Sequence, residues 1–402
     1  MNFFYHVRLA ILWFATIVIG GCLALGQVAR PVLTQLEDAA AKIAKGDLTS
    51  AESQLQNVLD TDTNNYQAMN LLGVVRAQQH READAEKLFK RVIVLKPSFS
   101  SARVNLGHLY AQMDRNDDAI AQLQEALRLE PNRQDALAAL VSIWRTQARA
   151  AAQAGELEKG LSILLQARKV APKEPSLLFD FGMIALRMSL LPDAIQAFQE
   201  ELSVRPDDPQ GLYGLGRAQI AFTKYAEAQS TFERLVELRP DDASAHYGFG
   251  LVLQALEHAE EARAQYERSI ELQPLQTEAY FQLGLIDLDE KKLDEASGRF
   301  NHVLQRNSKH AGAWFGAGRV EFEKKQYEKA IENLQRALAI NSSLRQAHYY
   351  LGLAYARTGK KEDSEKELGI ASQLEHEELE RHRGVLRILN LDLSPEAVEA
   401  KP

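Results

Sequence analysis

Residues 243–276, ASAHYGFGLVLQALEHAEEARAQYERSIELQPLQ, decide the fold of this chain. Each half of the stretch carries apolar residues at helical spacing: Ala245, Phe249, Val252 and Leu253 in the first half, and Ala262, Tyr266, Ile270 and Leu272 in the second. A break at Glu257 and His258 separates the halves. Pro274 ends the second half, because proline lacks an amide proton and clashes with the preceding turn. The stretch therefore predicts two amphipathic helices of about a dozen residues each, joined by a tight turn.

The same pattern returns every 34 residues, in two blocks separated by one longer repeat. Its markers are a glycine (Gly73, Gly107, Gly182, Gly216, Gly250, Gly284, Gly318 and Gly352), an alanine 12 residues later (Ala85, Ala119, Ala194, Ala228, Ala262, Ala296 and Ala330) and a proline near the end (Pro97, Pro131, Pro206, Pro240 and Pro274). A period of roughly 20 to 50 residues indicates stacked repeats. We expect the glycine and the alanine to lie where the two helices cross, so that a side chain larger than a methyl group would push the helices apart.

This pattern resembles the tetratricopeptide repeat. That family places an aromatic or apolar residue at position 4, Leu at 7, Gly or Ala at 8, an aromatic at 11, Ala at 20, an aromatic at 24, Ala at 27 and Pro at 32. Residues 311–344 match it at Trp314, Ala317, Gly318, Ala330, Leu334 and Ala337. Ten repeats can be counted: 32–65, 66–99, 100–133, 134–174, 175–208, 209–242, 243–276, 277–310, 311–344 and 345–378. The resemblance implies an all-α fold, a right-handed α-solenoid of about ten helix-turn-helix repeats.

The fourth repeat, residues 134–174, is seven residues longer than the others. Its second half keeps the expected spacing at Gly160, Ala167 and Pro172, so the extra residues lie in its first helix, around Gln147–Ala154. Seven residues are almost two helical turns, which predicts a first helix that protrudes by roughly 10 Å. The insertion is either neutral or a hinge between the repeats on its two sides.

The repeats divide the chain into five parts: 1–26, a signal peptide or membrane anchor; 32–133, N-terminal repeats; 134–174, the elongated repeat; 175–378, C-terminal repeats; and 379–402, a capping helix and tail. The cap is predicted at Leu379–Leu391, because a terminal repeat exposes an apolar face. The tail from Ser394 is expected to be disordered.

The first 26 residues indicate where the protein is located. Arg8 precedes an apolar run, Leu9 to Gly26, which is typical of a secretory signal peptide. Two alternatives stay open. Residues 9–26 are just long enough to remain as an inner-membrane anchor, and Ile19-Gly20-Gly21-Cys22 resembles a lipobox, which would make Cys22 a lipidation site. Each reading predicts a protein exported to the periplasm or tethered to the cell envelope.

The resemblance also implies where a partner binds, since the first helix of each such repeat lines a concave groove. Position 5 of these helices gives an aromatic ladder: Phe179, Tyr213, Tyr247, Phe281, Phe315 and Tyr349. Position 9 adds two arginines, Arg217 and Arg319. Aromatic residues and arginine are typical of interface hot spots. The alternative is that these aromatics serve only to pack the repeats.

The sequence favours a protein without catalysis, metal or cofactor. Its formal net charge is -8 with no Lys/Arg run, so nucleic-acid binding is not expected. Pairs such as Gly248 and Gly250 lack the third glycine of a dinucleotide fingerprint. We expect a protein-protein interaction scaffold that binds a partner segment in its groove, in cell-envelope assembly or export. The alternatives are a regulatory or recruiting subunit of a separate envelope enzyme such as a glycosyltransferase, and a saccharide-binding solenoid.

Overall fold

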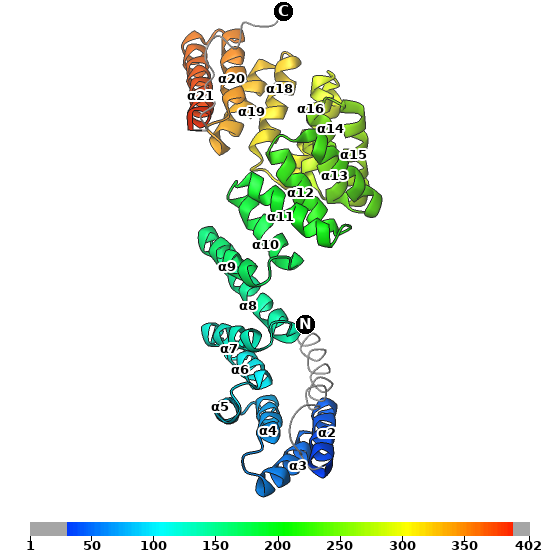
Figure 1. The fold of residues 1–402 in the computed structure, drawn as a ribbon. Helices are drawn as coiled ribbons and strands as arrows, with labels where there is room; N and C mark the ends of the chain where they lie inside the picture. Colours follow the sequence, from blue (N-terminus) through cyan, green and yellow to red (C-terminus); the bar gives the residue numbers. More distant parts are fainter. Residues whose placement is uncertain (1–29, 389–402) are drawn as a thin grey trace, which may run out of the picture. The chain divides into compact units, whose positions relative to one another are not determined.

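The computed structural model describes residues 30–388, and twenty α-helices with no strand make up its regular structure over that range. The chain divides into two compact units, Met1–Pro206 and Asp207–Pro402. Within each unit the helices follow one another in chain order, and each packs on its neighbours in sequence (Figure 1).

The described helices of the first unit are α2 (Arg30–Lys45), α3 (Leu48–Thr61), α4 (Tyr66–Gln78), α5 (Glu82–Leu95), α6 (Ser100–Gln112), α7 (Asn116–Leu129), α8 (Gln134–Gln153), α9 (Leu157–Val170), α10 (Pro175–Arg187) and α11 (Leu191–Val204). Those of the second unit are α12 (Pro209–Ala221), α13 (Tyr225–Leu238), α14 (Ala243–Ala255), α15 (Ala259–Leu272), α16 (Thr277–Asp289), α17 (Leu293–Arg306), α18 (Ala311–Glu323), α19 (Tyr327–Ile340), α20 (Arg345–Arg357) and α21 (Lys361–Ile388).

These helices form ten pairs, which confirms the ten repeats read from the sequence. In an ordinary pair the first helix has 13 residues and the second has 14, as in α12 and α13. The first helix of the fourth repeat, α8, has 20 residues, so the predicted elongation is confirmed. The boundary between the two units falls after the fifth repeat rather than at this long helix. A hinge at the long repeat stays a prediction.

Short polar side chains start many of the first helices. The carboxylate of Asp208 accepts a hydrogen bond from the backbone N–H of Gln210 at 3.0 Å. Asp242 accepts from the N–H of Ser244 at 2.9 Å. Each bond satisfies a backbone donor that the first helical turn leaves free, which is why an aspartate at this position begins a helix.

The tight turn inside each repeat uses a left-handed residue. In the seventh repeat this residue is Glu257, with φ +65°. Its N–H donates to the Gln254 carbonyl at 3.1 Å, and the N–H of His258 donates to the Leu253 carbonyl at 2.9 Å. These two bonds form a Schellman motif, which closes the end of the first helix. The equivalent residue is Gly155 after α8, with φ +85°.

The marker glycine and alanine lie in the interior of the repeat, and the packing at the glycine is tighter than the sequence indicated. Ala262 has 0% exposure. A Cβ placed on Gly250 would lie 2.6 Å from Cε1 of Tyr266, the buried aromatic of the second helix. The sequence predicted that a side chain larger than methyl would force the helices apart, and the constraint at Gly250 is tighter than that. Even a methyl group does not fit, because the facing residue is an aromatic ring and not only Ala262.

The end of the solenoid differs from the expected separate cap. α21 begins at Lys361 as the second helix of the tenth repeat and continues to Ile388 without a break. The predicted cap is thus helical to residue 388, as an extension of α21. The proposed signal peptide, Cys22 and the tail from Ser394 lie outside the described residues. Between residues 30 and 388, no helix is both long and apolar enough to cross a membrane.

Candidate functional site

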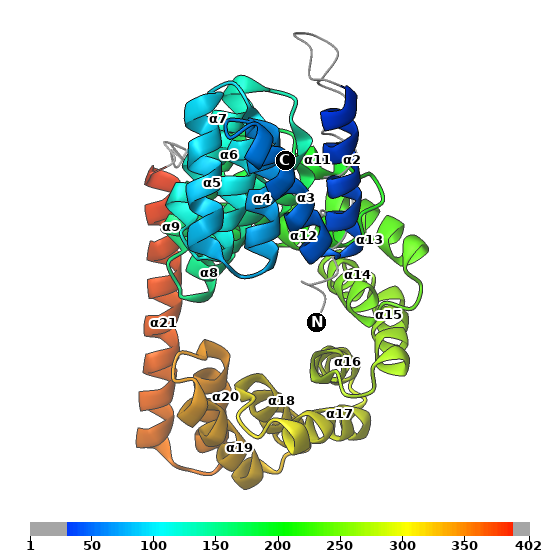
Figure 2. The ribbon, with the colours of Figure 1, turned by 90° about the horizontal axis from the view of Figure 1, so that it is seen from below.

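The first helices of the second unit form one surface. In Figure 2, α14, α16, α18 and α20 lie on the inner side of a curve, and α15, α17 and α19 lie on its outer side. The concave surface of this unit is therefore made by first helices, as the resemblance implied. We call the surface made by the first helices α12, α14, α16, α18 and α20 the first-helix face of the second unit, and use the same term for α4, α6, α8 and α10 in the first unit.

Each aromatic of the ladder in repeats five to eight packs against a buried aromatic of its own second helix. Ring centroids are 6.0 Å apart for Phe179 and Phe198, 6.1 Å for Tyr213 and Phe232, 5.9 Å for Tyr247 and Tyr266, and 6.1 Å for Phe281 and Phe300. These distances fit edge-to-face or tilted aromatic contacts, which stabilise a fold beyond the area that they bury. The packing role that the sequence left open is therefore present in the structure.

The ladder is not equally accessible along its length. Tyr213, Tyr247 and Phe281 are half-buried, so they pack inward and still offer ring surface to solvent. Phe315 is only 8% exposed, whereas Tyr349 is 48% exposed. Tyr349 on α20 is the most exposed rung, and the consecutive first helices α12, α14 and α16 present three half-buried rungs that are partly open to solvent.

The two arginines differ in the same way. Arg217 is exposed, and its guanidinium lies 5.8 Å from the Tyr213 ring centroid. Arg319 lies 5.2 Å from the ring of Tyr350 and 3.6 Å from a carboxylate oxygen of Asp289. Arg319 is therefore engaged within the fold, where it covers Phe315 together with Tyr350. Arg217 is the arginine that remains open for a partner.

The environment of Tyr247 favours its neutral form. Burial raises the pKa of the Tyr247 hydroxyl above the usual value, and Gln282 of α16 hydrogen-bonds to it. Burial likewise raises the pKa of Tyr266 beneath it. Neutral phenols offer a hydrogen-bond donor beside an apolar ring, a combination that suits peptide binding.

Phe179 belongs to the first unit, where it is half-buried on α10. The structure therefore gathers five of the six ladder residues in one unit, and Phe179 lies with the first unit.

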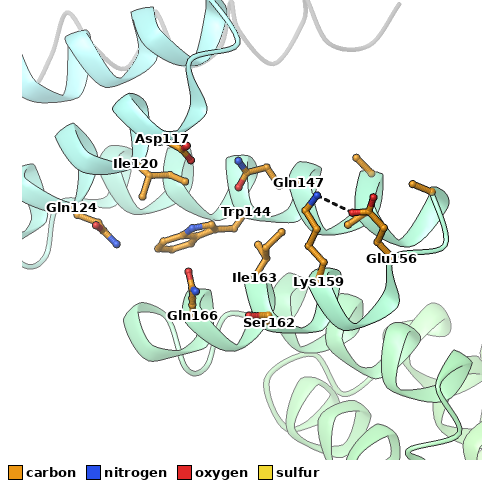
Figure 3. Close-up of a pocket in the computed structure, with 13 residues that line it drawn as sticks. Asp117, Ile120, Gln124, Trp144, Gln147, Glu156, Lys159, Ser162, Ile163 and Gln166 are labelled. Carbon is orange, nitrogen blue, oxygen red and sulfur yellow. Dashed lines mark hydrogen bonds and ion pairs between the residues drawn. The ribbon is translucent and has the colours of Figure 1, made fainter.

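A second candidate surface, which the sequence analysis did not identify, is a pocket of about 810 Å³ in the first unit. Its floor is Trp144 of the elongated helix α8, and Ile120 of α7 and Ile163 of α9 flank it (Figure 3). Trp144 is only 3% exposed, so little of its ring surface is open to solvent in the pocket.

The rim of this pocket is polar with little net charge. Gln124, Gln147 and Gln166 line it from three different helices. The ammonium of Lys159 pairs with a carboxylate oxygen of Glu156 at 2.7 Å (Figure 3). Amide side chains donate and accept hydrogen bonds, so the pocket suits an uncharged polar group. The extra length of α8 was the sequence signal that could have directed attention here.

A third feature that the sequence analysis missed is an ion cluster between first helices of the first unit. Asp180 of α10 lies 4% exposed between Arg145 and Arg149 of α8. The only sequence signal was a lone aspartate in the apolar segment 177–181. Over residues 30–388, no group of three or more His, Cys, Asp or Glu side chains is placed to hold a metal ion.

Comparisons with known proteins identify the repeats. A family model described as tetratricopeptide repeat matches residues 36–98, 145–211, 213–276 and 247–296, which is more than half of the chain. A second model with this description matches residues 76–143, and one described as TPR repeat matches residues 318–359.

Similarity to individual proteins is more limited. Protein O-mannosyl-transferase Tmtc3 of Drosophila melanogaster is 34% identical over 94 residues, 23% of this chain. The chain covers only 10% of the length of that relative.

Two solved structures are also similar to this chain. YrrB, described as a TPR protein with an unusual peptide-binding site, is 27% identical, with 46% of this chain and 95% of that chain covered and a TM-score of 0.38. A tetratricopeptide repeat protein from Parabacteroides merdae is 16% identical, with 63% and 98% covered and a TM-score of 0.45.

Proposed function

Because the chain belongs to the tetratricopeptide repeat family, we propose that it is a non-catalytic scaffold that binds a segment of a partner protein on the first-helix face of its second unit. Proteins of this family bind peptide or protein partners, and YrrB is described by its peptide-binding site. The observation that carries the proposal is the run of three accessible rungs, Tyr213, Tyr247 and Phe281.

These rungs combine a fixed position with an open surface. Each ring is held by a buried aromatic of its own repeat, so little side-chain entropy is lost when a partner binds. Arg217 adds an exposed cation beside the first rung. Aromatic anchors next to arginine are the residues that most often dominate binding energy at interfaces.

We further propose that this scaffold works at the cell envelope, in assembly or export. The proposal rests on the apolar segment 9–26 with Arg8 before it and Cys22 within it. An alternative role is a recruiting subunit of a glycosyltransferase. The local similarity to an O-mannosyl-transferase favours this alternative, although it spans a tenth of that protein. Co-purification of the chain with such an enzyme would distinguish the two roles.

The test is recovery of partners from a detergent extract of native membranes, followed by mass spectrometry. The variant to compare with the wild type carries Tyr213→Ala, Tyr247→Ala and Phe281→Ala. We expect a partner that the wild type retains and the variant loses, with roughly 1–2 kcal/mol lost per true hot spot. Circular dichroism should show that the variant remains helical.

A matched control removes apolar surface elsewhere in the second unit. Leu238, Leu275 and Ile340 are 39%, 72% and 42% exposed, and none of them lies on a first helix. Their triple alanine variant should retain the partner. Equal recovery by both variants would show that the ladder only packs the repeats.

A further inference from the structure

Arg145, Arg149 and Asp180 form an ion cluster on the first-helix face of the first unit, and the repeat pattern does not require these charged residues. Asp180 of α10 is 4% exposed. Arg145 of α8 donates from Nε to Asp180 Oδ2 at 2.7 Å. Arg149 donates to Oδ1 from Nε at 3.0 Å and from Nη2 at 2.7 Å. Both oxygens of one buried carboxylate are thus engaged by two guanidinium groups.

The cluster holds more positive charge and more donors than Asp180 can use. Two arginines against one aspartate leave an excess of one positive charge. A guanidinium has five N–H donors, of which Arg145 uses one on Asp180 and Arg149 uses two. The side chains of Arg145 and Arg149 are 28% and 53% exposed. The Arg149 side chain is therefore exposed, and that of Arg145 is half-buried.

The elongation of α8 creates much of this arrangement. An ordinary first helix of 13 residues would end at Thr146, so Arg149 lies in the added turns. Ala152 lies there as well, and its carbonyl accepts a hydrogen bond from Nη1 of Arg187 at 3.0 Å. The last turns of α8 thus hold three guanidinium groups, those of Arg145, Arg149 and Arg187.

We propose that Arg145, Arg149 and Arg187 bind the side-chain carboxylates of a short acidic segment in a partner protein. Guanidinium groups bind carboxylates through paired, charge-assisted hydrogen bonds, which are stronger than neutral ones. Asp180 fixes two of the three guanidinium groups before the ligand binds, which reduces the side-chain entropy lost on binding. The site lies in the first unit and does not depend on the rungs Tyr213, Tyr247 and Phe281 of the second unit.

The charge of the whole chain favours a short segment over a long polyanion. The formal net charge is -8, so a nucleic acid would be repelled over most of the surface. A segment of a few acidic residues is short enough to contact only the cluster. An acidic peptide that binds this acidic protein therefore needs a local cationic site such as this one.

The test uses the full chain and a fluorescein-labelled peptide of six glutamates with an amidated C-terminus, followed by fluorescence anisotropy. The expected result is binding that weakens as salt is raised, and no binding of the matched peptide of six glutamines. The hexaglutamate peptide with a free C-terminus should bind equally well. A requirement for the free C-terminus would overturn the assignment to side-chain carboxylates.

Two variants locate the site. Arg187→Gln does not touch Asp180 and should fold normally, with binding weakened several-fold. The combination Arg145→Gln, Arg149→Gln and Asp180→Asn removes the cluster without leaving a buried carboxylate unpaired, and should weaken binding at least roughly tenfold. Arg128→Gln on α7, where Arg128 is 68% exposed, is the matched control and should bind like the wild type. No binding by the wild type, or equal affinity in all four proteins, would overturn the proposal.

Discussion

At the scale of single residues, the absence of a side chain sets how closely two helices approach. Gly250 faces the ring of Tyr266, and Gly284 faces that of Phe300 in the same way. A large buried ring fits only because the opposite helix has no Cβ there. These two repeats therefore depend on a pair of residues at positions 8 and 24, a glycine and a large aromatic, whereas Gly107 and Gly318 face Leu123 and Leu334.

Gly250→Ala should destabilise the protein by roughly 1–3 kcal/mol, because its methyl group would lie 2.6 Å from Tyr266 Cε1. The matched control is Gly298→Ala in α17, where a Cβ meets no atom within 4 Å. That change should stabilise the helix by about 0.5–1 kcal/mol, since alanine favours helix over glycine. Urea unfolding measures both, and the same sign for both variants would contradict the packing described here.

His302 of α17 should make stability depend on pH. Burial, together with Arg306 and Arg299, lowers the pKa of His302 below its usual value. Its ring stacks on Tyr280 with centroids 3.7 Å apart. The folded state then binds a proton less readily than the unfolded state. This contribution to stability is therefore present above about pH 6.5 and is lost as pH falls through the lowered pKa.

His302→Phe keeps a ring against Tyr280 but cannot titrate. The fall in melting temperature between pH 7.5 and pH 5.5 should be smaller in this variant than in the wild type. An identical fall in the two proteins would show that protonation of His302 does not contribute.

The sequence alone could not predict which single charged side chains are buried. Asp180 sits in an apolar helix, and its partners are 31 and 35 residues away, at distances that no local pattern predicts. Trp144 matched the aromatic that a first helix was expected to carry, so nothing in its position indicated a pocket. The ladder residues could be predicted because they recur at the period, but their exposure could not, since neighbours such as Tyr350 and Arg319 decide it.

At the scale of elements, the turn inside each repeat is a point of strain. A left-handed conformation costs a residue other than glycine roughly 1–2 kcal/mol. Seven of the turns use such a residue, including Glu257, and three use glycine. The left-handed conformation is kept because it allows the Schellman hydrogen bonds that end the first helix.

Glu257→Gly should therefore stabilise the protein by up to about 1 kcal/mol. The control is Glu267→Gly in the middle of α15, in the same repeat. It replaces the same exposed residue type and should destabilise by about 1 kcal/mol, because glycine is unfavourable inside a helix. Thermal unfolding monitored by circular dichroism gives both values. A destabilised Glu257→Gly variant would mean that the Glu257 side chain has a role in the turn that the structure does not reveal.

Helix boundaries followed from the sequence wherever a glycine, proline or capping residue recurred with the period. α21 is the exception. The tenth repeat has His376 where repeats two to seven carry proline, and its second helix continues through this position to Ile388 in place of a separate cap. Proline is not required to end a second helix, because α17 and α19 end at Arg306 and Ile340 in repeats that carry Ser308 and Ser342 instead.

Across the whole molecule, the first-helix faces of the two units differ in chemistry. In the second unit, Tyr213, Tyr247 and Phe281 present aromatic rings held from beneath. In the first unit, α8 and α10 present guanidinium groups around Asp180. A partner with an apolar segment and one with an acidic segment could therefore bind to the same chain, in different places.

The repeat architecture was predictable because ten copies in register repeat the same few constraints. The binding surfaces were only partly predictable. The aromatic ladder could be predicted because its residues occupy equivalent positions in successive repeats. The arginine cluster and the Trp144 pocket involve the insertion in the fourth repeat, which interrupts the 34-residue period.

We propose that a partner protein contacts the first-helix face of the second unit. Photo-crosslinking tests it most directly, with a benzophenone amino acid placed in turn at Tyr213, Phe281, Leu238 and Ile340 of the full chain in native membranes. We expect Tyr213 and Phe281 to crosslink to the same protein, and Leu238 and Ile340, which lie on second helices, not to crosslink to it. The same crosslinked protein at all four positions, or crosslinks only at Leu238 and Ile340, would contradict it.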